Sequence, residues 1–206
     1  MTLASVVVGE DEKYIEAIGH IRARYQALGR AAPLFVYVPR APERFLVAGE
    51  MLIQAGLQVQ ARSAVLDADF GLQFGLQVDL TETDILIGDS LGEMYFYLAL
   101  ADIVIVGGGF TPTGAHNVIE PLALKKPVFV GPYTWTIEFP ALDAIAAGVL
   151  TQCESIDILG TEILQRLESE TSMAQDQQAA QDFYNQHSGA VEKMITAIDE
   201  VLANPV

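Results

Sequence analysis

The sequence predicts an α/β protein built on a doubly wound parallel sheet, the Rossmann-like arrangement. Short apolar, β-branched runs alternate with longer segments of helical periodicity over the first 150 residues. Several of these runs are apolar at every position, which is typical of strands in a parallel sheet that helices cover on both faces. A chain of 206 residues is long enough for one such domain and short for two.

The predicted strands are short, and helices are expected between them. Because alternating strands and helices form right-handed βαβ units, one sheet is expected to collect all the strands. Strands are expected at 5–8, 34–38, 57–62, 85–87, 103–106 and 128–130, and helices at about 10–28, 42–54, 91–101, 119–125 and 138–147. The stretch 64–83 has little periodicity and is expected to be a loop or irregular segment.

The pattern of predicted secondary structure changes after residue 150. Residues 1–150 carry the strand–helix alternation and form the predicted Rossmann-like binding domain. From Thr151 onward the pattern is helical only, so 151–206 are expected to be helices packed on that same domain. This tail holds ten acids against Arg166 and Lys193, half of the formal net charge of −16. A solvated acidic helical surface accounts for that charge without a functional role.

Composition excludes several classes of function. Asp and Glu number 27 against 11 Lys and Arg, and the resulting field repels nucleic acids and anionic lipid surfaces. No nucleic-acid partner is therefore expected. The single cysteine, Cys153, excludes an internal disulfide, fits a reducing compartment and is assigned a packing role. The first residues lack a basic region followed by a long apolar run, so no signal peptide is predicted and the chain is expected to be cytoplasmic.

The segment 104–121 is the richest in residues suited to binding a ligand. A predicted strand ends in glycines, Gly107 and Gly108 among them, and a helix begins near Asn117. Open α/β sheets bind ligands beyond the carboxyl ends of their strands, where glycines let the backbone approach a phosphate or a sugar. The glycines match neither the G-x-G-x-x-G fingerprint nor a P-loop, which disfavours NAD-linked and NTPase chemistry.

Three polar side chains are expected at the mouth of this site. Pro121 is tolerated only in a first helical turn, and this places His116, Asn117 and Glu120 together. A carboxylate such as Glu120 can accept hydrogen bonds from a ribose diol, while the other two can donate to a phosphate. The alternative is that Asn117 and Glu120 merely form a capping box.

A second segment, 87–94, again follows a strand and opens a helix. It brings Gly92 and Glu93 to the same rim of the sheet. The alternative is that Asp89 or Ser90 is only the helix N-cap, with the glutamate in the first turn.

Two further loops add candidates. Arg40 lies just past a predicted strand, a natural position for a phosphate or base contact, although a surface ion pair with Glu43 is the alternative. Gly9 and Glu10 follow the first strand, where their alternative role is to mark the start of a helix.

Metal and nucleophile chemistry are not predicted. His20 and His187 stand isolated on helical patterns, and no cluster of His, Cys and carboxylates has metal-ligand spacing. Neither a G-x-S-x-G elbow nor a Cys/His pair is present. We expect no metal and no cofactor.

Four motifs in order resemble those of one enzyme family. They are P-R-x-P-E-R-F at 39–45, G-D-[ST]-x-G-E-M at 88–94, A-D-[IV]-x-[IV]-V-G-G at 101–108 and G-x-H-N-x-x-E-P-x-A-L-x-K-P-V-x-x-G-P at 114–132. Together they resemble 3-deoxy-D-manno-octulosonic acid (Kdo) transferases, glycosyltransferases of lipopolysaccharide assembly. The resemblance runs from about Ser5 to Val201 and covers only the second half of such an enzyme.

The resemblance implies one half of a two-domain GT-B glycosyltransferase. In that family the N-terminal half carries the lipid A acceptor site, the catalytic carboxylate and a membrane anchor, and the C-terminal half binds the donor, CMP-Kdo. The chain is thus expected to be a donor-binding domain that is inactive alone. Its expected partners are CMP-Kdo or CMP and the N-terminal acceptor domain, and through that domain a lipid A precursor. The full enzyme is expected at the cytoplasmic face of the inner membrane.

Roles follow by position in the shared motifs. The resemblance implies that Arg40 contacts the cytidine or its phosphate, Asn117 faces phosphate or Kdo, and Glu120 takes the ribose hydroxyls. It further implies Gly92 and Glu93 along the nucleotide and Gly9 and Glu10 near the sugar. The chain departs from the family pattern at Val7, Val8, Ala41, Tyr133 and Thr136.

Two other functions are compatible with the same residues. One is a half-domain of the UDP-sugar epimerase type, which shares the Rossmann pair and a helix-start glutamate and would prefer UMP to CMP. The other is a module that binds a nucleotide without catalysis, or a degenerate fragment that binds none. The valines before Gly9 and the alanine at position 41 favour this last reading.

Overall fold

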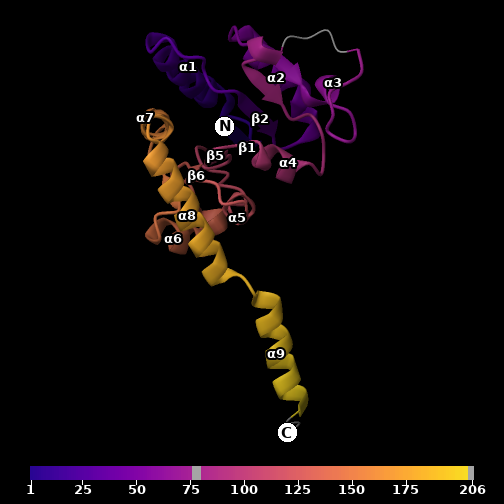
Figure 1. The fold of residues 1–206 in the computed structure, drawn as a ribbon, viewed down its shortest axis with the longest axis vertical. Helices are drawn as coiled ribbons and strands as arrows, with labels where there is room; N and C mark the ends of the chain where they lie inside the picture. Colours follow the sequence, from indigo (N-terminus) through magenta and orange to yellow (C-terminus); the bar gives the residue numbers. More distant parts are fainter. Residues whose placement is uncertain (76–79, 204–206) are drawn as a thin grey trace.

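A computed structural model describes residues 1–75 and 80–203 and contains a seven-stranded, fully parallel sheet (Figure 1). The strand order is β3-β4-β2-β1-β5-β6-β7. The strands are β1 Thr2–Val6, β2 Phe35–Pro39, β3 Val59–Ala61, β4 Ile85–Ile87, β5 Val104–Val106, β6 Val128–Val130 and β7 Leu150–Gln152.

Helices connect the strands and follow the last of them. The α-helices are α1 Asp11–Ala27, α2 Phe45–Gln54, α3 Arg62–Val65, α4 Met94–Ala99, α5 Ile119–Ala123, α6 Glu138–Ala146, α7 Ile156–Leu167, α8 Glu170–His187 and α9 Ala190–Ala203. Short 3-10 turns lie at Pro42–Arg44, Leu80–Glu82 and Trp135–Ile137.

Successive strand residues pack against opposite faces of the sheet, which explains why the strands are apolar throughout. Leu3 and Ile105 belong to the core cluster that includes residues of α1, α2 and α7. Their neighbours Ala4 and Val104 belong to the cluster on the other face, with residues of α4, α5, α6 and α8. Because side chains alternate across a strand, both faces need apolar residues. The predicted doubly wound architecture is confirmed.

The chain changes direction across the sheet between β1 and β5. β1 connects to β2 on one side, and after β4 the chain crosses to β5 on the other side of β1. Such a switch point opens a crevice beyond the carboxyl ends of the strands, and ligands of open α/β sheets bind there.

Most predicted elements are present with shifted ends. The first strand begins three residues and ends two residues earlier than predicted, at Thr2–Val6, because the chain turns at Val7, whose backbone N–H donates to the Glu10 carboxylate at 3.2 Å. The predicted helix 91–101 is shorter, Met94–Ala99. The irregular segment 64–83 contains the end of α3, a 3-10 turn and an isolated bridge between Leu66 and Leu72, while its residues 76–79 lie outside the described part.

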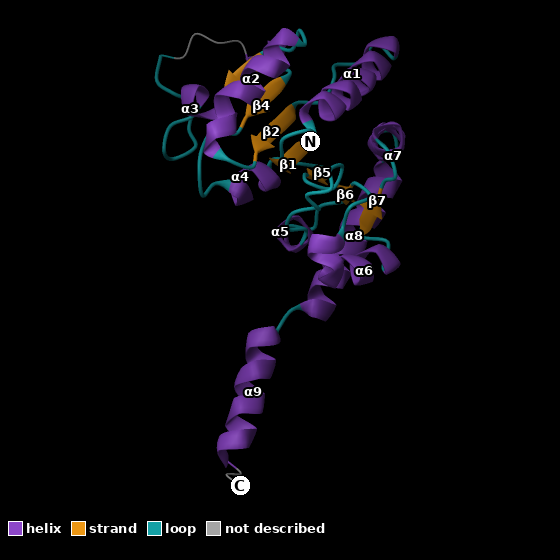
Figure 2. Ribbon diagram, turned by 180° about the vertical axis from the view of Figure 1, so that it is seen from behind, coloured by secondary structure: helices purple, strands orange, loops and turns teal. Residues whose placement is uncertain are grey.

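The C-terminal region differs from its prediction in two ways. It begins with a strand, β7, which pairs in parallel with β6, rather than with a helix. Helices α7 and α8 pack on the domain, but the described side chains of α9 are exposed, and Figures 1 and 2 show this helix extending away from the body. A helical C-terminal segment is therefore present, but only part of it covers the sheet.

In residues 1–75 and 80–203, no helix combines the length and the apolar character needed to cross a bilayer.

Cys153 provides a test of the packing. It is fully buried beyond β7, and burial together with the charges of Glu162 and Glu154 raises the pKa of its thiol to about 12. Only about one thiol in ten thousand is then ionised at pH 8. We expect an aromatic disulfide reagent to leave the native chain unmodified at pH 8 and to react with one thiol per chain in urea. Rapid reaction with the native chain would contradict this packing.

Candidate functional site

All ten predicted site residues follow the carboxyl ends of four neighbouring strands. Because the sheet is fully parallel, its carboxyl ends share one edge, and β4, β2, β1 and β5 are adjacent there. Gly92 and Glu93 follow β4, Arg40 follows β2, and Gly9 and Glu10 follow β1. The segment after β5 supplies the remaining five, Gly107, Gly108, His116, Asn117 and Glu120. The edge spans the switch point, so the fold gathers these residues into one region.

Glu10 ties the two sides of the switch point together. Its Oε2 accepts hydrogen bonds from the backbone N–H of Gly108 at 2.8 Å and of Val7 at 3.2 Å, and its Oε1 accepts from the N–H of Phe110 at 3.0 Å. The Tyr14 hydroxyl donates to Oε1 at 3.3 Å. The side chain is completely buried, and burial raises the pKa of its carboxyl group although these hydrogen bonds oppose the rise.

The resemblance implied that Glu10 sits near the sugar, and the described structure adds a structural role for its carboxylate. Its oxygens face the protein backbone, so it shapes the loop after β5 rather than presenting a charge to a ligand. The alternative role that the sequence offered, marking the start of a helix, is also found, because Glu10 is the residue immediately before α1.

The glycines after β5 allow the protein to pack on itself. A Cβ at Gly107 would overlap the carbonyl oxygen of Ser5 on β1, and one at Gly108 would overlap that of Gly114. Both are buried, and Gly108 has a φ of +87°. These contacts show that the two glycines are needed for close packing of the protein backbone, and the prediction that they let the backbone approach a phosphate stays a prediction. Gly9 and Gly92 are different: both are exposed with positive φ, and Gly92 has open space around it.

His116 lies at the inner side of the rim. Its ring Nε2 is buried and has no hydrogen-bond partner in the described part of the chain. Burial lowers the pKa of the imidazole, and the positive charge of Arg40 lowers it further. Both effects favour the neutral form of the imidazole.

Arg40 and Glu120 carry charges that the described residues leave unpaired. No ion pair to Arg40 is found there, so its predicted alternative pairing with Glu43 is absent. Arg40 is exposed, and Glu120, in the first turn of α5, is partly exposed. An arginine and a carboxylate left free on one rim suit a phosphate and a diol respectively.

Asn117 does not form the predicted capping box. Its Oδ1 accepts from the backbone N–H of Ile119 at 2.9 Å, while the N-cap position belongs to Val118. Pro121 lies in the first turn of α5, as predicted. Asn117 is exposed and keeps its amide group as a donor.

Glu93 is held by a partner that sequence reasoning missed. Arg62 Nη2 donates to Glu93 Oε1 at 2.8 Å, and Arg62 Nε lies 2.7 Å from Oε2. The Ser90 hydroxyl also donates to this carboxylate. The predicted N-cap role of Asp89 or Ser90 is not found, because Glu93 occupies the N-cap position of α4. The sequence separation of 31 residues between Arg62 and Glu93 hides this pair from any local pattern.

A cluster of ligand-type side chains on helices α1 and α7 corrects another expectation. Glu16, His20 and Asp157 each place one ligand-type atom within 4.8 Å of the others, so His20 is not isolated. The fold brings α7 beside α1, which no sequence spacing could indicate. All three side chains are exposed, and none belongs to the predicted site.

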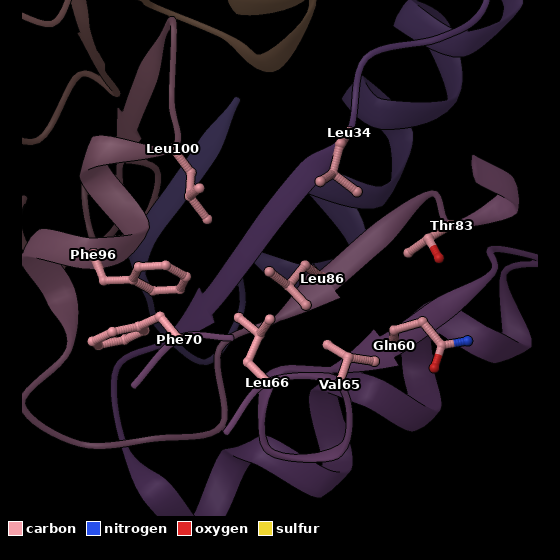
Figure 3. A pocket seen from close by; sticks show the side chains of 9 residues that line it. All are labelled: Leu34, Gln60, Val65, Leu66, Phe70, Thr83, Leu86, Phe96 and Leu100. Carbon is pink, nitrogen blue, oxygen red and sulfur yellow. The ribbon is translucent and has the colours of Figure 1, made fainter. Parts of the chain in front are cut away.

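An apolar cavity of about 260 Å³ lies away from the predicted residues. Figure 3 shows its lining side chains, with the rings of Phe70 and Phe96 side by side. None of the ten predicted site residues lines it.

The fold and the polar rim define a class of protein: the Rossmann-like half-domain of GT-B glycosyltransferases. A solved structure supports the assignment. The chain matches the C-terminal CMP-Kdo binding domain of WaaA from Acinetobacter baumannii with a TM-score of 0.74 and 25% sequence identity, over 88% of this chain and 86% of that one.

Relatives in sequence point to the same enzymes. The chain is 38% identical to 3-deoxy-D-manno-octulosonic acid transferase of Bordetella pertussis over 202 residues and 29% identical to that of Haemophilus influenzae over 206 residues. Each alignment covers 98% of this chain and 44% of the relative, so the chain spans less than half of these enzymes. No protein-family model matches the sequence. The chain is homologous to part of the Kdo transferases.

The Glu10 contacts make a stability prediction. In Glu10→Gln an amide group replaces one oxygen and faces backbone N–H donors, which leaves at least one buried donor unsatisfied. We expect the free energy of unfolding to fall by roughly 1–3 kcal/mol in urea titrations. Glu12→Gln, at an exposed position of α1, is the matched control and is expected to change it by less than about 0.5 kcal/mol. Equal stabilities of the two variants would contradict the assigned role.

The same substitution has a pH signature. Because the pKa of Glu10 is raised in the folded state, that state binds more protons than the unfolded one between the ordinary and the raised pKa. The contribution of Glu10 to stability is thus full below the ordinary pKa and is lost as pH rises through the raised one. Glu10→Gln is expected to lack this decline, while Glu12→Gln keeps it.

Proposed function

We propose that this chain is the donor-binding domain of a Kdo transferase and holds CMP-Kdo at the carboxyl edge of β4, β2, β1 and β5. The observation that carries the proposal is the pair of unpaired charges, Arg40 and Glu120, on the rim of a domain homologous to Kdo transferases. The solved relative named as a CMP-Kdo binding domain supports the same ligand.

Each exposed rim residue is assigned a contact. Arg40 binds the phosphate of the nucleotide through its guanidinium fork, and Glu120 accepts hydrogen bonds from the ribose hydroxyls. Asn117 donates its free amide to the phosphate or the sugar. His116 lies at the inner side of the rim, where its buried Nε2 has no hydrogen-bond partner among the described residues. Gly92 leaves room for the nucleotide to lie along the rim.

The buried residues support this edge without touching the ligand. Glu10 holds the loop after β5, and Gly107 and Gly108 let that loop pack against its neighbours. These buried residues hold the loop that carries the exposed residues after β5.

In the complete enzyme this domain would bind and orient the donor. An acceptor hydroxyl gives its proton to the carboxylate of the second domain and bonds to the anomeric carbon of Kdo, while the bond from that carbon to the phosphate oxygen breaks and CMP departs with the charge that Arg40 offsets. The acceptor site and the catalytic carboxylate belong to a second domain, which binds the lipid A precursor. We therefore propose that the chain alone is inactive and that the whole enzyme works at the cytoplasmic face of the inner membrane.

A calorimetric titration with CMP, UMP and AMP tests the assignment. The chain is expected to prefer CMP, and Glu120→Ala to weaken CMP binding about tenfold or more, because two hydrogen bonds to a charged acceptor are lost. Glu192→Ala removes an exposed carboxylate on α9, away from the body in Figure 1, and is expected to leave binding unchanged.

Other outcomes would redirect the assignment. A preference for UMP would favour a half-domain of the UDP-sugar epimerase type. Equal affinity for all three nucleotides, or equal effects of Glu120→Ala and Glu192→Ala, would contradict a ribose contact at Glu120. A stable fold that binds none of the nucleotides would contradict the donor-domain proposal.

A further inference from the structure

The loop between β4 and α4 is attached to the short helix α3 at two successive residues. Arg62 pairs with Glu93 as described above, and the backbone N–H and hydroxyl of the next residue, Ser63, both donate to the Asp89 carboxylate. The first and last acidic side chains of the loop are therefore both held by α3. Without these contacts, two carboxylates would stand free beside the proposed nucleotide site.

Arg62 is built to stay in this position. Only 7% of its side chain is exposed, compared with 22% for Glu93. Its Nη1 donates to the backbone oxygen of Leu66 at 3.1 Å, and its guanidinium lies 5.0 Å from the centre of the Phe70 ring. Phe70 stacks in turn on Phe96 of α4 at 4.4 Å, as Figure 3 shows. Arg62 is thus held in place by contacts with α3, the helix that it begins, and with Glu93 at the start of α4.

The negative charge near the proposed site requires a cation beside Glu93. The whole chain carries a formal charge of −16, and the proposed ligand is an anion. A carboxylate at Glu93, on the rim beside open Gly92, repels a phosphate unless a nearby cation offsets it. The backbone N–H groups of Leu91 and Gly92 make no hydrogen bond within the described residues, so they are available to a ligand once that repulsion is cancelled.

We propose that Arg62 is a positioning residue of the donor site: it neutralises and orients Glu93, so that the loop 88–93 presents free backbone N–H groups rather than a bare carboxylate to the nucleotide phosphate. Arg62 does not touch the nucleotide and acts through Glu93. This inference rests on the proposed donor-binding function and deepens it.

The test compares CMP with uncharged cytidine in calorimetric titrations. Arg62→Gln is expected to lower CMP affinity about tenfold or more and cytidine affinity much less, because without the cation the Glu93 carboxylate repels the phosphate, which cytidine lacks. The double variant Arg62→Gln/Glu93→Gln is expected to recover most of the CMP affinity. A merely structural role would weaken both ligands equally and would not be rescued.

Two further variants complete the design. Arg22→Gln breaks a comparable pair, Arg22–Asp84, which lies at the amino end of β4, and is expected to leave CMP binding unchanged. Ser63→Ala changes an exposed residue and removes the hydroxyl's hydrogen bond to Asp89 while the backbone N–H bond stays, so it loosens the second attachment of the loop and gives a further test should Arg62→Gln not fold. It is expected to weaken CMP binding about threefold with little effect on cytidine.

The outcomes separate the two proposals. A parent chain that binds no CMP overturns the donor assignment and this inference with it. A parent chain that binds CMP, alongside Arg62→Gln and Ser63→Ala variants that bind it equally well, overturns only the role of Arg62. Equal losses for CMP and cytidine, without rescue by the double variant, also overturn it.

Discussion

The structure depends most on one buried carboxylate at the crossing point of the sheet. Glu10 leaves β1 and accepts hydrogen bonds from the loop after β5, so a single side chain fixes the two segments that flank the switch point. A buried charge is costly without partners, and here backbone donors and Tyr14 supply them. The glycines of that loop are part of the same constraint, because larger residues would not let the backbones approach closely enough for Glu10 to reach them.

The residues of the rim therefore fall into two groups: those that support the fold and those that are proposed to bind the ligand. Glu10, Gly107 and Gly108 are buried and satisfied within the protein, whereas Arg40 and Glu120 keep free charges at the surface. A strongly acidic chain can hold an anionic ligand only if its own carboxylates near the site are neutralised or turned inward. Glu10 is turned inward, and Glu93 is paired with a cation. Because these two carboxylates are buried or paired, the negative net charge of the chain is compatible with binding of an anionic nucleotide.

The sequence predicted the fold class, and it placed the candidate residues at the carboxyl edge of the sheet, because periodicity and the rule for open parallel sheets are local and topological signals. It did not predict β7, since Leu150–Gln152 is three residues long at the edge of the sheet and leads directly into helical sequence. The burial of Glu10 was not predictable either, because Gly108 and Phe110 lie about a hundred residues away. Arg62 was missed for the same reason: its meaning depends on a long-range contact.

The most direct test of the account is an NMR titration of the isotopically labelled chain with CMP, following every backbone amide. The account predicts that the largest shifts cluster at Arg40, Gly92 and the segment 114–120, on the loops after β2, β4 and β5. It also predicts small shifts along the cavity lining in Figure 3 and along α9. Shifts concentrated at that cavity, or a spectrum unchanged by CMP, would contradict the claim that the carboxyl edge at the β1–β5 switch point is the donor site.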